Sequence, residues 1–76
     1  MENLIKLIRA EINLLGADPI GHDEVAVQYE FPYRAKYGER RWTKQVCVAT
    51  YDEFDTEAFY GIIYNKVQAL RKELEQ

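Results

Sequence analysis

The stretch of sequence that decides the fold is residues 24–31, which read EVAVQYEF. Apolar side chains occupy the odd positions there, and the even positions are mostly polar. A period of two residues is typical of a β-strand with one buried face. The sequence therefore predicts a half-buried strand over residues 24–31, whose buried face carries Val25, Val27, Tyr29 and Phe31. Pro32 is expected to end this strand.

A second β-rich run covers residues 41–50, and the two runs together predict a β-hairpin. The connecting loop, residues 33–40, is longer than a tight turn. We expect a register that stacks the large apolar side chains on one face, with the cross-strand pairs Phe31 and Trp42, Val27 and Val46, and Val25 and Val48. In that register Cys47 lies on the opposite face, across from Ala26.

Residues 2–15 are predicted to form the first helix. At helical spacing, the apolar residues expected in the core fall on one stripe, which consists of Leu4, Ile5, Ile8, Ile12 and Leu15. Gly16 stands where a left-handed residue commonly ends a helix. Residues 17–23 are then a turn-rich connection, because they contain Pro19 and Gly21.

The last helix is predicted over residues 52–76. Its core stripe is Phe59, Ile63, Val67, Leu70 and Leu74. Thr50 and Glu53 have the spacing of a capping box, in which each side chain bonds the other residue's backbone N–H, and Asp52 or Asp55 is the alternative cap. Gly61 lies inside this helix and is expected to permit close packing against another element.

These elements predict a single domain, residues 1–76, of the α+β class. Its order is helix, strand, strand, helix, with an antiparallel β-hairpin packed on one face by two helices. The order resembles that of double-stranded-RNA-binding domains, which have a third strand and a basic start to the last helix. Here that start, residues 52–57, reads DEFDTE, so we assign the chain to no family.

The inventory of reactive side chains argues against an enzyme. The chain has one histidine, His22, one cysteine, Cys47, and no serine. A serine triad is therefore excluded, and a Cys–His pair has only one way to form. No zinc-ligand spacing and no glycine-rich phosphate loop occur. We expect no catalytic residues, no metal and no cofactor.

Location is predicted from the same inventory. A single cysteine forms no internal disulfide, and the first residues do not read as a signal peptide. No apolar run approaches the ~20 residues that span a bilayer. The chain is expected in the cytoplasm, away from membranes.

A basic, aromatic hairpin tip at residues 33–44 is the first candidate binding surface. Half of the ten basic residues lie there, interleaved with aromatic rings. Its predicted contact residues are Arg34, Lys36, Tyr37, Arg40, Arg41 and Trp42. Arginine and aromatic residues are enriched where proteins bind one another, and they also grip phosphates and stack on bases. A solvated loop is the plain alternative.

The second candidate surface is a flank of the last helix, where Tyr60 and Tyr64 extend the apolar arc. Both helices are apolar over a wider arc than one sheet face covers, which predicts a homodimer. The acidic residues at positions 52–57 suit the start of a helix, whose dipole favours negative charge. A hard cation, or phosphate mimicry toward a basic partner, is the alternative use of this cluster.

The function expected from these features is that of a small non-enzymatic interaction protein. It binds another macromolecule, a protein in the leading hypothesis, as a homodimer. The size class suggests an accessory or inhibitor protein of a phage or mobile element. The alternative is a nucleic-acid-binding protein that uses the hairpin tip.

Overall fold

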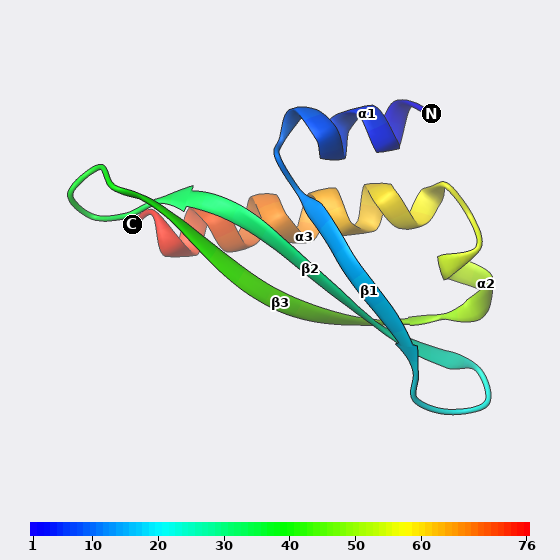
Figure 1. Ribbon diagram of the computed structural model, residues 1–76. Helices are drawn as coiled ribbons and strands as arrows, with labels where there is room; N and C mark the ends of the chain where they lie inside the picture. The colour runs from blue at the N-terminus through cyan, green and yellow to red at the C-terminus, as the bar shows by residue number, and fades with distance from the viewer.

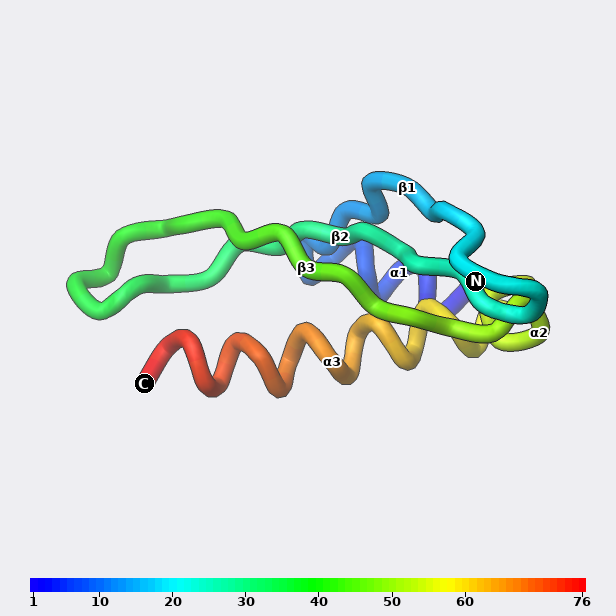
Figure 2. The backbone as a smooth tube through the Cα atoms, turned by 90° about the horizontal axis from the view of Figure 1, so that it is seen from below, coloured from blue at the N-terminus to red at the C-terminus, as the bar shows by residue number.

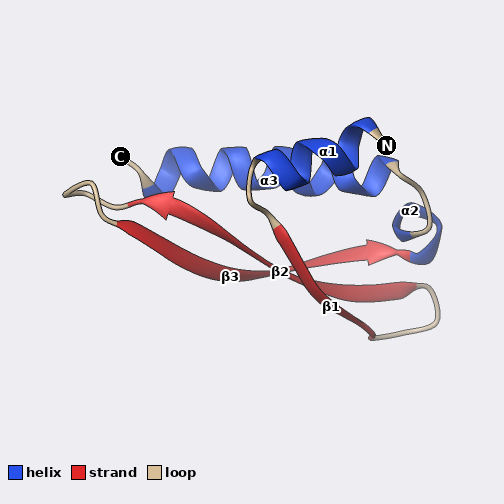
Figure 3. Ribbon diagram, turned by 45° about the horizontal axis from the view of Figure 1, so that its top comes forward, coloured by secondary structure: helices blue, strands red, loops and turns tan.

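Six secondary-structure elements make up the computed structural model, which describes residues 1–76 (Figure 1). They are α1 (Glu2–Arg9), β1 (Asn13–Pro19), β2 (Glu24–Arg34), β3 (Arg40–Thr50), α2 (Tyr51–Phe54) and α3 (Ala58–Leu74). The three strands form one antiparallel sheet in the order β1-β2-β3. The helices α1 and α3 lie side by side and cover one face of it (Figure 3). The predicted α+β class is confirmed, and the sheet gains a third strand.

The central strand β2 carries the buried face that its alternation predicts. Val25, Val27, Tyr29 and Phe31 are all buried in one cluster with α3 residues. The apolar stripe of α3 is also confirmed in its first part, because Phe59, Ile63 and Val67 are buried. Leu70 is half-buried and Leu74 is exposed at the end of the helix, where the sheet no longer covers it.

Pro32 does not end β2, contrary to the sequence prediction. The strand continues to Arg34, and Pro32 is buried within it. The missing N–H of Pro32 costs nothing, because it faces the side of β2 where β1 has already stopped: β1 begins only opposite Glu30.

The register between β2 and β3 differs by one residue from the predicted one. Val25 pairs with Ala49 and Val27 with Cys47. Because side chains alternate, this shift buries Cys47 and Ala49 and turns Trp42, Val46 and Val48 to solvent. The turn at residues 35–39 sets the register. It is closed by the N–H of Ala35 on the Glu39 carbonyl and contains Gly38 at a positive φ of 84°.

The first helix is shorter than predicted, and the residues that follow it form a strand. Helix α1 ends at Arg9 in a Schellman motif: Ile12 N–H bonds the Leu7 carbonyl, Glu11 N–H bonds the Ile8 carbonyl, and Glu11 is left-handed with φ 61°. Gly16 is therefore not a helix cap, and lies at a bulge in β1. Residues 13–19 form a strand instead of extending the helix because they pair with the free edge of β2 through backbone hydrogen bonds.

The predicted core stripe of the first helix is right only in part. Ile12 is buried and Leu4 is half-buried, but Ile5, Ile8 and Leu15 are 44%, 66% and 45% exposed. Leu7, outside the predicted stripe, is 1% exposed. A helix of eight residues packs only a narrow stripe against its neighbour, and α3 rather than the sheet is the main neighbour of α1. Leu7 points into the core, and Ile12 is buried from the connection to β1.

The predicted last helix is divided by residues 55–57 into α2 and α3. The capping box is confirmed, since Thr50 Oγ1 accepts from Glu53 N–H and the Glu53 carboxylate accepts from Thr50 N–H. It begins the short α2, which places Phe54 edge-on to Phe59 at 5.4 Å. The close approach at Gly61 is present too, because an added Cβ would lie 3.3 Å from the Asn3 side chain in α1.

Candidate functional site

The turn of the hairpin tip projects beyond the end of α3 (Figure 2), and most tip residues are exposed, while Tyr33, Ala35 and Thr43 are half-buried. The structure keeps the six predicted tip residues together at this end. It distributes them over different faces. Arg34, Arg40 and Trp42 share one face of the β2–β3 ladder, whereas Arg41 is on the other. Lys36 and Tyr37 lie in the turn, where Tyr37 is 82% exposed.

Two of the five basic side chains at the tip are paired with carboxylates within the chain. Arg40 forms an ion pair with Glu11 and lies 5.6 Å from the Trp42 ring centre. Arg41 bonds the Glu39 carboxylate at 2.9 Å, and this hydrogen bond and charge raise the Arg41 pKa. Lys44 stands opposite Glu30 in the ladder. Arg34, Lys36 and Lys44 form no ion pair, so three of the five basic side chains at the tip remain unpaired.

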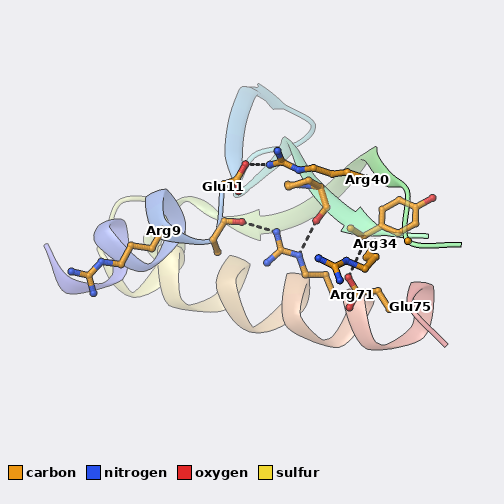
Figure 4. A pocket seen from close by; sticks show the side chains of 10 residues that line it. Arg9, Glu11, Arg34, Arg40, Arg71 and Glu75 are labelled. Carbon is orange, nitrogen blue, oxygen red and sulfur yellow. Dashed lines mark hydrogen bonds and ion pairs between the residues drawn. The ribbon is translucent and has the colours of Figure 1, made fainter. Parts of the chain in front are cut away.

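A hollow of about 370 Å³ lies between the hairpin and the ends of α1 and α3 (Figure 4). Four arginines and two glutamates line it, namely Arg9, Arg34, Arg40, Arg71, Glu11 and Glu75. Four arginines would suit an anion. However, the carboxyl ends of α1 and α3 point toward the hollow, and the dipole at a helix carboxyl end repels anions and favours cations.

Arg71, one of the four arginines that line the hollow, has a structural role there. Its guanidinium donates to the Pro32 carbonyl at 3.0 Å and to the Ala10 carbonyl at 2.6 Å. The side chain of Glu75 accepts from the Arg34 backbone N–H at 2.9 Å. Side chains of α3 thus satisfy the edge of β2 that β1 leaves open. Burial lowers the Arg71 pKa, as expected for a charge held among neutral carbonyl groups. The hollow is a structural junction.

Tyr60 and Tyr64 lie on α3, apart from the hairpin tip. Both are half-buried and pack against the core. The Tyr64 ring lies 5.7 Å from Lys6 Nζ of α1, and its hydroxyl accepts a hydrogen bond from Gln68 at 3.0 Å. Part of the wide apolar arc of α3 is therefore used inside the molecule, as contact with α1.

The residues of interest to catalysis do not form a site. His22 is exposed in the turn between β1 and β2, and Cys47 is buried in the core. No cluster of three or more histidine, cysteine or acidic side chains is arranged to hold a metal ion. None of the helices is both long and apolar enough to cross a membrane.

Sequence reasoning missed the outer edge of β3. The row formed by Trp42, Val46 and Val48 was interpreted as core, but these side chains are 48%, 62% and 53% exposed on the uncovered face of the sheet. Cross-strand neighbours of this row on β2 include Ala26 and Gln28. The sequence predicted that Trp42, Val46 and Val48 share one face of the strand, and only the assignment of that face to the core was wrong.

Comparisons with known proteins give no family: no family model, curated protein or solved structure matches the chain. The surfaces of this chain must therefore be interpreted from their own geometry.

Proposed function

We propose that this chain is a small, non-enzymatic protein-interaction module that binds an extended polypeptide strand along the outer edge of β3. One observation carries the proposal: β3 is a regular edge strand of eleven residues with no cover. Its main neighbours are β2 and the adjoining α2. Long uncovered edges are templates for pairing with another strand.

Hydrogen bonding at both ends of the β2–β3 ladder shows which groups face outward. Ala35 N–H bonds Glu39, and Tyr51 N–H bonds Asp23, so odd-numbered residues pair across the hairpin. Bonded and non-bonded pairs alternate in an antiparallel ladder. The even-numbered residues of β3 therefore turn their N–H and C=O groups to the free edge. These are Trp42, Lys44, Val46 and Val48.

The other edge of the sheet is protected. Strand β1 has seven residues, a bulge between Leu14 and Gly16, and Pro19 at its end. Short strands, bulges and prolines are the devices that keep an edge from pairing. Within β3 the regular register with β2 is unbroken, and no proline occurs. This asymmetry supports β3 as the binding edge.

The nucleic-acid alternative has less support from the geometry. Two of the arginines at the tip are held by Glu11 and Glu39, and the chain is acidic overall, with net charge −3. Affinity for nucleic acid depends on cations free to replace counterions on phosphates.

The test uses two proline substitutions of matched type. Val46→Pro removes an outward N–H from β3, and Ala17→Pro does the same on β1, so neither breaks an internal hydrogen bond. Each tagged variant is exposed to lysate from cells that naturally contain the chain. We expect polypeptides that the wild type and Ala17→Pro retain to be lost with Val46→Pro.

If Val46→Pro retains the same polypeptides as the wild type, the proposal is wrong. So would binding to labelled DNA or RNA that falls steeply with salt and is lost in the double variant Arg40→Ala, Arg41→Ala. That second result would establish the nucleic-acid alternative.

A further inference from the structure

We infer that the strand bound by β3 is the β3 of a second copy of this chain, paired antiparallel about a two-fold axis. This inference rests on the proposed function and names the partner. The argument comes from the distribution of charge along the molecule, the symmetry of the exposed row and the chemistry of the free edge.

Charge is strongly polarised along the hairpin. At the tip, residues 34–41 hold four basic side chains, of which two are paired with Glu11 and Glu39, so Arg34 and Lys36 carry the unpaired positive charge. At the other end, residues 18–24 and 52–57 hold seven acidic side chains and no lysine or arginine. One of these, Glu57, contacts the amino terminus. Figure 1 shows the tip at one end of the molecule and α2 with the β1–β2 turn at the opposite end.

Antiparallel pairing of two β3 strands matches these ends. Strand β3 runs from the basic tip to the acidic α2, so the tip of one copy lies beside α2 of the other, and this occurs twice. A parallel arrangement would bring tip to tip and acid to acid. The molecule is 43 Å long, several times the ~8 Å Debye length at physiological salt, so the two ends act as separate charges. The charges therefore favour the antiparallel arrangement.

The exposed row is self-complementary in one register of that arrangement. With the two-fold axis at Gln45, Trp42 of one copy stands opposite Val48 of the other, and Lys44 stands opposite Val46. All of these residues have outward-facing backbone groups. An aromatic ring against a β-branched side chain is a stabilising cross-strand pair. The pairing would join the two sheets into one of six strands and give the apolar rows of both copies cross-strand contacts with each other.

The first experiment is sedimentation of the purified chain. We expect a species of twice the 9.0 kDa chain mass. Val46→Pro is expected to sediment as a folded monomer, checked by circular dichroism, while Ala17→Pro remains a dimer. A wild-type monomer at millimolar concentration would overturn the inference, and so would a dimer that Val46→Pro leaves intact.

The second experiment tests the antiparallel arrangement by exchanging charges. One variant reverses the tip with Lys36→Glu and Arg41→Glu, and the other reverses the acidic end with Asp52→Lys and Asp55→Lys. These positions leave the capping residue Glu53 and the Arg40–Glu11 pair unchanged. Each variant alone is expected to dimerise about tenfold more weakly, because like charges now meet twice.

Mixing the two variants is expected to restore the affinity, since each reversed end then meets an opposite charge. The antiparallel arrangement is wrong if the mixture dimerises as weakly as each variant alone, or if the tip-reversed variant dimerises best with the wild type. The lysate test separates this failure from failure of the proposed function. If the wild type is a monomer, and the polypeptides that it retains from lysate are lost with Val46→Pro, then β3 binds strands of other polypeptides and not a second copy of this chain.

Discussion

Arg71 of α3 donates a hydrogen bond of 2.6 Å to the carbonyl of Ala10, the C-cap residue of α1. The same guanidinium reaches the Pro32 carbonyl of β2 at 3.0 Å and lies 5.5 Å from the Phe31 ring centre. One side chain therefore joins both helices to the sheet at the place where β1 has ended. This relationship makes the junction sensitive to a single substitution.

Replacing Arg71 by methionine is expected to destabilise the protein by about 2 kcal/mol, because two carbonyl groups lose a charged donor. Arg71→Lys should restore only part of this loss, since an ammonium group does not present the planar fork that bonds both carbonyls. Chemical denaturation provides the measurement, with Lys72→Met, an exposed neighbour, as the control. Equal effects at positions 71 and 72 would contradict the described role of Arg71.

Substituting Glu11 by glycine is expected to stabilise the protein by about 1 kcal/mol. Glu11 is held at φ 61°, where a side chain is strained and glycine is not. Its exposed ion pair with Arg40 offsets only a small part of the gain. Lys66→Gly, at an exposed position in the middle of α3, is the control and should instead cost about 1 kcal/mol. Thermal unfolding of the two variants should give shifts of opposite sign, and shifts of the same sign would argue against the Schellman end of α1.

The thiol of Cys47 tests the register of the hairpin. In the observed register Cys47 pairs with Val27 and is 4% exposed. In the register shifted by one residue it would face solvent. We therefore expect a thiol reagent to modify native Cys47 at least a hundredfold more slowly than the unfolded chain, with the rate limited by opening of the structure. Fast modification of the folded protein would favour the shifted register.

Tyr29 is expected to ionise at a higher pH than an ordinary tyrosine, because its pKa is raised. Burial, and then the nearby Cys47 thiol, raise its pKa above the ordinary value of about 10. A raised pKa means that the folded state holds the phenolic proton more tightly than the unfolded state. The resulting stability is complete below pH ~10 and is lost as the pH rises through the folded value. Tyrosinate absorbance during an alkaline titration, compared with Tyr29→Phe, measures this step. A Tyr29 that ionises at the ordinary tyrosine value of about 10 would contradict it.

Several local features follow from the sequence alone, because they depend on neighbours along the chain. The alternation in residues 24–31 is sufficient to place Val25 and Phe31 in the core. The Thr50–Glu53 capping box forms between residues three apart, and the stripe through Phe59 and Ile63 is set by helical spacing. The exposed basic tip follows in the same way from the composition of residues 33–44.

The remaining features were decided by tertiary contacts. Residues 13–19 joined a sheet instead of extending a helix, because β2 offered an unpaired edge and Glu11 ended α1 in an unfavourable but supported conformation. The one-residue register was decided by the turn at 35–39 and by the burial of Cys47 and Ala49, and alternation alone does not say which face is covered. The sequence by itself thus determined the periodicities. Only packing decided that the row of Trp42, Val46 and Val48 faces outward, because a period of two fixes two faces and leaves their assignment to whatever covers one of them.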